Sequence, residues 1–215
     1  MGEDLTLSIV GVEPGELSAG AQPITIRTTR GEIRLVLHAA SNRGRAVVCV
    51  SGAHGGLDGP AALYPRLGLK LPPIGLSVAR VDYREPGEFG ECLLDTMAAL
   101  SFLKGLGHQR VTLIGHSFGG AVAINAGTLS PAAATVVAIS SQLGGAHVVA
   151  ELAPRPLLLI HGSDDTVLSP QSSQALYERA GEPKVLKLFP GAGHGLAQVG
   201  DELLELVAAW IVNYG

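Results

Sequence analysis

The 215-residue chain has few charged residues and few aromatic residues. Only 16% of its residues are Asp, Glu, Lys or Arg, against about 25% in an average soluble domain. It has no basic run, and its formal net charge of −4 gives no electrostatic footprint for nucleic acid. Aromatic residues, at 4%, are too few to build platforms on which bases stack. We therefore expect no nucleic-acid partner.

Cysteine is equally scarce, since Cys49 and Cys92 are far apart in apolar segments. This arrangement argues against a disulfide framework and predicts two buried, inert thiols. The N-terminal segment MGEDLTLSIV carries acidic residues where a signal peptide would be basic, and no long apolar core follows it. The sequence therefore predicts a cytoplasmic protein.

Charge is absent altogether from residues 111–150, which raises the possibility of a membrane segment. A membrane span needs about 18–20 continuous apolar residues. Here polar residues such as Asn125 and Gln142 interrupt the segment repeatedly. A strand, a helix and a second strand, all buried within a domain, explain the segment better. We therefore expect no membrane partner.

Short apolar runs recur along the chain and alternate with helical patterns. The runs expected to be strands are residues 24–29, 33–38, 46–50, 76–82, 110–114, 135–140, 156–160 and 184–189. The expected helices are residues 58–71, 91–104, 118–129, 170–180 and 201–212. Only residues 30–32 separate the first two strands, which indicates a hairpin. The pattern predicts one α/β domain over residues 1–215: a mostly parallel sheet of about eight strands, with an N-terminal antiparallel hairpin and helices on both faces.

A single serine stands between glycines where an apolar run meets an alanine-rich one, in RVTLIGHSFGGAVAINAG. Gly115, Ser117 and Gly119 match the G-x-S-x-G nucleophile elbow, which exposes a serine at a sharp strand-to-helix turn. Such a turn needs neighbours without bulk, and the glycines supply them. The free N–H groups of a helix beginning at Phe118 would stabilise an oxyanion beside Ser117. In the alternative, Ser117 only caps a helix in a glycine-rich crossover.

Two further polar loops follow predicted strands. HGSDDTVLSP follows residues 156–160, and PGAGHG follows residues 184–189. In a parallel sheet, loops at the carboxyl ends of the strands meet at one edge, where chemistry gathers. The order serine, aspartate, histidine is that of the elbow enzymes. His194 is thus the candidate base and Asp164 or Asp165 the candidate acid. The other histidines lack metal-ligand spacing, so we expect no metal.

These motifs together resemble the α/β-hydrolase superfamily, from the first hairpin to the C-terminal helix. The resemblance implies the α/β-hydrolase fold and an esterase-like serine hydrolase. In that family the acid loop commonly has the pattern H-G-x-x-D, which begins here at His161 and places the acid at Asp165. The base commonly lies in a G-x-G-H-like turn, which places it at His194. The implied triad is Ser117, His194 and Asp165.

The glycine-rich segment SGAHGGLDG follows the third predicted strand and raises a nucleotide-binding alternative. It contains neither G-x-G-x-x-G nor G-x-x-x-x-G-K, which argues against that alternative. The resemblance instead makes it the second half of an oxyanion hole. Ser51 stands where the family usually has histidine before the glycine. The backbone N–H of Ala53 is the first candidate donor and that of His54 the second, together with the N–H of Phe118.

The interval from Ser141 to Pro154 is too short for the helical cap that many members of the family carry. The resemblance therefore implies a lid-less hydrolase, without cofactor, that cleaves small acyl esters or thioesters through an acyl-enzyme. Its expected partner is a small-molecule acyl substrate. The alternative is a non-catalytic protein of the same fold that serves in ligand binding or interaction. The sequence carries no signal for an oligomeric state.

Overall fold

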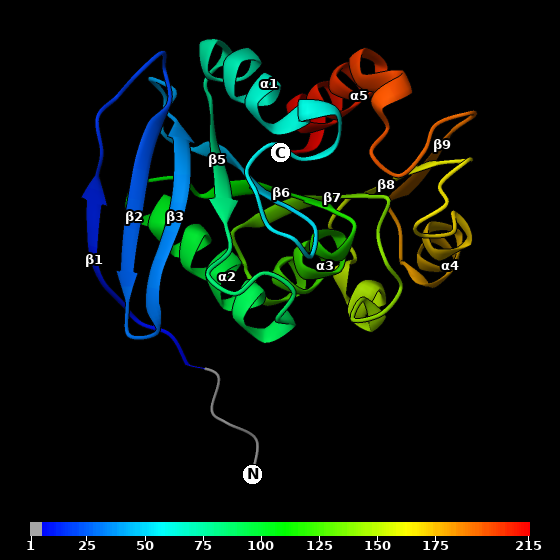
Figure 1. The fold of residues 1–215 in the computed structure, drawn as a ribbon, viewed down its shortest axis with the longest axis horizontal. Helices are drawn as coiled ribbons and strands as arrows, with labels where there is room; N and C mark the ends of the chain where they lie inside the picture. Colours follow the sequence, from blue (N-terminus) through cyan, green and yellow to red (C-terminus); the bar gives the residue numbers. More distant parts are fainter. Residues whose placement is uncertain (1–5) are drawn as a thin grey trace.

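A computed structural model describes residues 6–215 (Figure 1). Residues 1–5 lie outside the described residues. They include Glu3 and Asp4, the acidic residues that argue against a signal peptide. The strands of the described part are β1 (Ile9–Pro14), β2 (Gln22–Thr28), β3 (Gly31–His38), β4 (Arg45–Val50), β5 (Leu76–Asp82), β6 (Arg110–His116), β7 (Ala133–Ile139), β8 (Leu157–Gly162) and β9 (Lys184–Phe189). Its α-helices are α1 (Leu63–Lys70), α2 (Phe89–Gly105), α3 (Phe118–Leu129), α4 (Gln171–Arg179) and α5 (Gly200–Tyr214).

These strands form one sheet in the order β1-β2-β3-β5-β4-β6-β7-β8-β9. The pairs β1–β2, β2–β3 and β3–β5 are antiparallel, and every pair from β5 to β9 is parallel. The predicted mostly parallel sheet with an N-terminal hairpin is therefore confirmed. The prediction of about eight strands missed β1. This edge strand has no buried residue, so its sequence lacks the apolar alternation of a half-buried strand.

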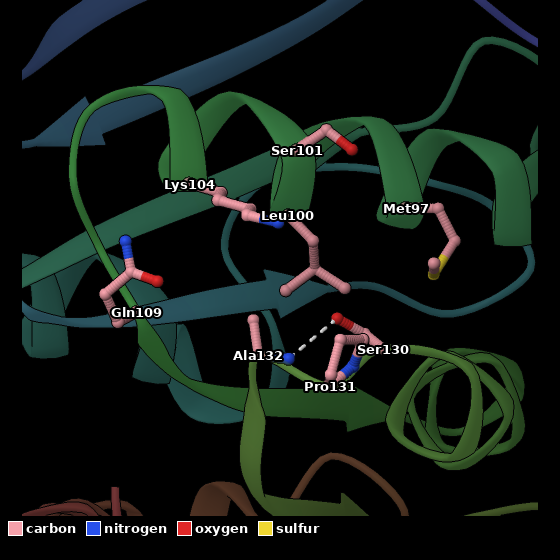
Figure 2. Close-up of a pocket in the computed structure, with 8 residues that line it drawn as sticks. All are labelled: Met97, Leu100, Ser101, Lys104, Gln109, Ser130, Pro131 and Ala132. Atoms are coloured by element: carbon pink, nitrogen blue, oxygen red, sulfur yellow. Dashed lines mark hydrogen bonds between the residues drawn. The ribbon is translucent and has the colours of Figure 1, made fainter.

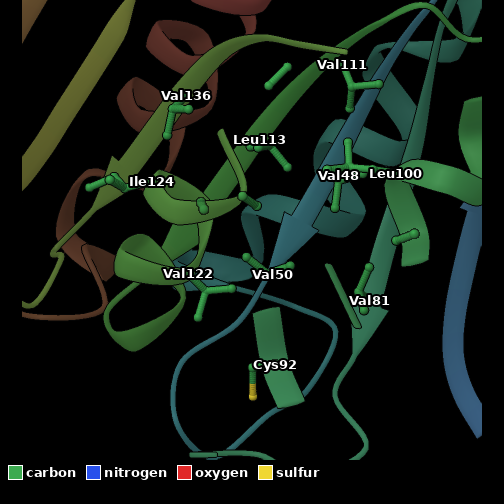
Figure 3. Close-up of a cluster of buried hydrophobic side chains, with 14 of the residues drawn as sticks. Val48, Val50, Val81, Cys92, Leu100, Val111, Leu113, Val122, Ile124 and Val136 are labelled. Atoms are coloured by element: carbon green, nitrogen blue, oxygen red, sulfur yellow. The ribbon is translucent and has the colours of Figure 1, made fainter. Parts of the chain in front are cut away.

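Helices cover both faces of the sheet, and alternate residues of each central strand point to opposite faces. Val48 and Val50 of β4 pack in the cluster that includes α2, α3 and α4, drawn in part in Figure 3. Val47 and Cys49 of the same strand pack in the cluster that includes α1 and α5. In Figure 1 the helices α1 and α5 lie above the sheet and α2, α3 and α4 below it. Burial on both faces explains why these strands are continuous apolar runs.

The charge-free segment forms β6, α3 and β7, as predicted, and most of α3 is buried. Within residues 6–215, no helix combines the length and the apolar character needed to cross a bilayer. Cys49 and Cys92 are free and buried, as expected. Burial raises the pKa of Cys92 to about 12 and raises that of Cys49 further. Neither thiol is therefore ionised near neutral pH.

The first predicted helix differs from the sequence expectation. The helix expected over residues 58–71 is shorter: α1 begins at Leu63, after the 3-10 turn η1 (Pro60–Ala62). Asp95 in α2 is fully buried, although charged residues of a helix usually face solvent. Its carboxylate accepts hydrogen bonds from the backbone N–H and Nε of Arg84, at 2.8 and 2.5 Å. This pairing ties α2 to the end of β5.

Candidate active site

Ser117 lies at the junction of β6 and α3 with φ 58° and ψ −120°. A positive φ is strained for a residue with a side chain and persists only where the surroundings fix it. Two hydrogen bonds fix the backbone of Ser117 in this conformation. The Ser117 N–H donates to the carbonyl of Ile139 at 2.8 Å, and the Ser117 carbonyl accepts from the Gly120 N–H at 3.0 Å. The serine is therefore held at a sharp strand-to-helix turn, the conformation of a nucleophile elbow.

The glycines around Ser117 are required by close backbone contacts. A Cβ at Gly115 would collide with the carbonyl of Gly119, one turn further on. A Cβ at Gly119 would collide with the carbonyl of Ser51, at the end of β4. The turn thus lies directly against the neighbouring strand and the loop that follows it.

The imidazole of His194 and the carboxylate of Asp165 form a hydrogen bond, with Nδ1 and Oδ2 2.7 Å apart. Asp165 follows β8 and His194 follows β9, so adjacent parallel strands deliver the pair to one edge of the sheet. The two loops are in direct contact, since a Cβ at Gly162 would collide with the carbonyl of Ala192. The arrangement orients the His194 ring with Nδ1 as donor, which leaves Nε2 free to accept a proton.

Asp165 is buried, and its carboxylate has further partners. Oδ1 accepts from the backbone N–H groups of Val167 and Leu168, at 2.8 and 2.9 Å. Oδ2 also contacts Nε2 of the buried His161 at 3.0 Å. Burial alone would raise the pKa of Asp165, but the hydrogen bonds from His194, Leu168 and Val167 outweigh it and lower the pKa. Asp165 is therefore an anion that can stabilise a protonated imidazole.

Asp164 is placed differently from its neighbour. Its side chain is exposed, and Oδ1 accepts a hydrogen bond from the hydroxyl of Ser163 at 2.6 Å. Its backbone N–H donates to the carbonyl of Ala192. The structure thus pairs His194 with Asp165, and Asp164 stabilises the turn. No group of three or more His, Cys, Asp or Glu side chains within residues 6–215 is arranged to hold a metal ion.

The backbone of His194 lies beside the elbow. Nε2 of His116, the residue before Ser117, is 3.1 Å from the His194 carbonyl oxygen. The His116 and His194 rings have centroids 4.8 Å apart. In the described part of the chain, the Ser117 hydroxyl makes no hydrogen bond, so none joins it to the imidazole of His194. Catalytic hydrogen bonds are often open without substrate and tighten once it binds.

The loop after β4 runs next to Ser117. A Cβ at Gly52 would lie 3.5 Å from the Ser117 Cβ. The Ser51 hydroxyl donates to the Gly56 carbonyl at 2.6 Å, and the Gly55 N–H donates to the Gly52 carbonyl at 3.0 Å. These bonds close a tight turn that leaves the N–H groups of both Ala53 and His54 unused within residues 6–215, and both stay candidate oxyanion donors.

Phe118, whose N–H is the other candidate donor, begins α3 and is nearly buried. Its ring packs edge-to-face against Tyr83 and Phe89, at centroid distances of 6.4 and 5.8 Å. Such contacts fix the position of a ring, and with it the first residue of the helix. The positive end of the α3 dipole therefore points at Ser117 from a fixed position.

Two polar residues at the site have no signal in the sequence. Ser140, directly after β7, is fully buried and donates its hydroxyl to the His194 carbonyl at 3.0 Å. Tyr64 of α1 is fully buried and donates its hydroxyl to the carbonyl of Val50, the last residue of β4, at 2.8 Å. Only tertiary contacts reveal these residues, because neither belongs to a local motif.

A separate cavity of about 260 Å³ lies away from this site (Figure 2). It is lined by Met97, Leu100 and Lys104 of α2 and by Ser130, Pro131 and Ala132, which precede β7. These positions are at the amino ends of the strands, whereas Ser117, Asp165 and His194 follow the carboxyl ends. The cavity is therefore not a binding pocket for the candidate active site.

Comparison with known proteins agrees with this fold. A serine hydrolase homologue from Coxiella burnetii superposes with a TM-score of 0.76 at 18% identity, over 90% of this chain and 99% of that one. Dienelactone hydrolase from Anabaena variabilis gives a TM-score of 0.75 at 16% identity, over 91% and 99% of the two chains. The chain has the α/β-hydrolase fold, as predicted from the sequence.

Sequence comparisons find one family model and several relatives. The family model described as serine aminopeptidase, S33, matches residues 145–198. The uncharacterised protein YfhR of Escherichia coli K12 is 31% identical over 182 residues, which is 69% of this chain and 63% of that relative. The match thus spans less than two thirds of the length of YfhR.

Proposed function

We propose that the protein is a serine hydrolase that cleaves small acyl esters or thioesters through Ser117, His194 and Asp165. The observation that carries the proposal is the strained Ser117 at a strand-to-helix turn, beside a hydrogen-bonded histidine–aspartate pair. A non-glycine residue is retained in such a conformation where function needs it. The cytoplasmic location predicted from the sequence belongs to the same proposal.

In the first step, Ser117 Oγ attacks the carbonyl carbon of the substrate, and its proton passes to Nε2 of His194. Asp165 stabilises the imidazolium that forms, through the 2.7 Å bond to Nδ1. The N–H groups of Phe118 and of Ala53 or His54 stabilise the oxyanion. The intermediate then expels the alcohol or thiol, which takes the proton from His194.

In the second step, water attacks the acyl-enzyme while His194 accepts its proton. A second tetrahedral intermediate collapses, the carboxylic acid leaves, and the proton returns to Ser117 Oγ. The same donors and the same histidine therefore serve both halves of the reaction.

The segment between β7 and β8 supports the proposed substrate class. It contains only the short 3-10 helix η3 (His147–Leu152) and no cap. Gln142 lies near the serine, since its N–H approaches the Ser117 carbonyl at 3.3 Å, and Leu143 packs against the core. A site without a lid favours small acyl groups over long lipid chains.

The second candidate is a non-catalytic protein that binds a ligand at the same place. The observation in its favour is the Ser117 hydroxyl, which makes no hydrogen bond within residues 6–215. A serine that never engages a base would be a poor nucleophile.

Labelling with a fluorophosphonate separates the two candidates. We expect an adduct of one label per chain, mapped to Ser117 by mass spectrometry and absent from Ser117→Ala, whose melting temperature stays close to that of the parent. No adduct on the folded parent protein would contradict the hydrolase and favour the ligand-binding candidate. A panel of esters and thioesters graded by acyl length would then define the substrate. Aminoacyl amides belong in the panel because the matching family model describes an aminopeptidase.

A further inference from the structure

The backbone carbonyl of His194 faces two side-chain hydrogen-bonding groups from different strands. Nε2 of His116, at the end of β6, lies 3.1 Å from this oxygen, and Oγ of Ser140, directly after β7, lies 3.0 Å from it. A carbonyl oxygen only accepts hydrogen bonds, so both groups act as donors. The base-carrying loop is therefore attached to the end of β6, which leads into the elbow, and to the residue that follows the neighbouring strand β7.

The loop needs such an attachment because glycines stand on both sides of His194, at positions 193 and 195. Glycine has more conformational freedom than any other residue, so a glycine-flanked segment loses more entropy when it is fixed. The imidazole alone would be held only by its bond to Asp165. A backbone attachment restricts the position from which the ring extends.

His116 suits this role because its ring is neutral at working pH. Burial lowers its pKa to about 4, although the bond to the His194 carbonyl acts in the opposite direction. The titratable groups that face the ring are His194, Asp165 and His161. A neutral ring with its proton on Nε2 donates to the carbonyl without adding a positive charge 4.8 Å from the His194 ring, where an imidazolium must form.

The backbone conformation of Ser140 also supports a role in holding the His194 carbonyl. It adopts φ 44°, which is unfavourable for a residue with a side chain, and it is fully buried. Its N–H donates to the carbonyl of Ile160 at 2.7 Å, so the neighbouring strand fixes its backbone. This strained backbone directs the hydroxyl at the His194 carbonyl. Strain of this kind persists only where surrounding contacts over-determine it.

We propose that His116 and Ser140 are positioning residues that clamp the His194 carbonyl and so hold the imidazole between Asp165 and Ser117. The proposal rests on the proposed function, because it assigns a task within that site. Neither residue touches the reacting atoms. Each acts through the backbone of the base.

The test compares His116→Leu, His116→Gln and Ser140→Ala in the full chain. Glutamine places an amide N–H donor close to where Nε2 of the imidazole lies, whereas leucine places none. We expect kcat to fall about tenfold or more in His116→Leu with KM within about twofold, and to return to within about threefold of the parent in His116→Gln. Ser140→Ala, which removes one oxygen, should lower kcat about fivefold. The double variant should lose less than the product of the single losses, because both donors serve one oxygen.

A second readout does not depend on turnover. Proton NMR detects the His194 Nδ1 proton bonded to Asp165 as a downfield resonance, which His194→Gln removes and so assigns. We expect this resonance to broaden or vanish in His116→Leu and to persist in His116→Gln. His108→Leu is the matched control, because it removes a buried histidine that accepts from the Gly44 N–H at the opposite end of β6. It should lower stability and leave the resonance and KM unchanged.

Retention of both kcat and the resonance in His116→Leu would overturn the proposal, as would equal losses in His116→Leu and His116→Gln. If His116→Leu does not fold, Ser140→Ala decides by the same two readouts. Failure of the proposed function gives a different result: no label on Ser117 and no turnover in the parent protein, with the NMR comparison still informative.

Discussion

The carboxylate of Asp165 accepts hydrogen bonds from four donors, and their origin distinguishes this residue from Asp164. Two are imidazoles, His194 and His161, and two are backbone N–H groups of the loop itself. Nε2 of His161 also contacts the carbonyl of Leu168 at 3.0 Å, so this nitrogen carries the proton. The buried His161 thus donates to the same carboxylate oxygen, Oδ2, that accepts from His194.

Replacing either aspartate by asparagine tests this difference. In Asp165→Asn the remaining oxygen can still accept from the Val167 and Leu168 N–H groups, so the loop should keep its shape. The amide N–H would then face the imidazole donor and favour the wrong tautomer. We expect kcat to fall about 10³–10⁴-fold. Asp164→Asn should change kcat less than about threefold, because its side chain is exposed and bonded to Ser163.

Steady-state kinetics on the best ester, with a thermal melt of each variant, measures both effects. A larger loss for Asp164→Asn than for Asp165→Asn would contradict the assignment of the acid.

At the scale of elements, α1 connects to the site although it covers the face of the sheet opposite to α3. Its buried Tyr64 reaches the end of β4 and donates to the Val50 carbonyl, just before the candidate oxyanion loop. The turn before α1 folds closely over this ring, where Gly59 with φ 65° leaves no room for a Cβ. The helix thus fixes the point at which the loop leaves the sheet.

Tyr64→Phe removes only the hydroxyl that makes this contact. We expect stability to fall by about 1 kcal/mol, the net contribution of a typical buried hydrogen bond. We also expect kcat to fall several-fold with little change in KM, because a displaced loop weakens oxyanion stabilisation. Urea denaturation and steady-state kinetics measure the two effects. Tyr214→Phe, at an exposed tyrosine of α5, serves as control. Full kcat in a destabilised Tyr64→Phe protein would limit the hydroxyl to a structural role.

At the scale of the whole molecule, three buried or partly buried histidines make folding sensitive to acid. Burial is the largest cause of a lowered pKa at His38, His108 and His116. The unfolded chain binds protons at these residues below a pH of about 6.5, whereas the folded chain binds them only at lower pH. Stability is therefore lost as the pH falls from about 6.5 towards 4, and these histidines contribute no slope above neutrality.

Urea denaturation at pH 7.5, 6 and 5 should show this loss as a progressive fall in the free energy of unfolding. His38→Leu should reduce the slope, because the apolar side chain cannot titrate in the same buried position beside Gly68. His147→Leu, at an exposed histidine, should not. Constant or rising stability between pH 7.5 and 5 would contradict the prediction.

The sequence predicts the order of the elements well because its apolar runs have clear periods and clear ends. The strands β5 and β9 and the helix α3 have the predicted boundaries, and the ends of the other predicted strands differ by at most two residues. β1 escapes prediction because an edge strand exposed on both sides has no apolar period. Asp95 is another exception, because its burial depends on Arg84, 11 residues away in sequence.

At the candidate site, the local motifs lead to Ser117, Asp165 and His194, since each stands in a glycine-rich or H-G-x-x-D turn. Ser140 and Tyr64 could not be predicted in this way. Their roles arise from hydrogen bonds to carbonyls 54 and 14 residues away in sequence. A single sequence does not specify these contacts.

The contact between Gly162 and the carbonyl of Ala192 has a consequence for exchange of segments between related proteins. The last residue of β8 must lack a side chain so that the turn before the base can pass over it. A recombinant chimera with its junction between β8 and β9 would take Gly162 from one parent protein and the turn that contacts it from another. Gly162 and the turn before His194 must therefore come from the same parent protein. A change at either one limits the changes that the other tolerates.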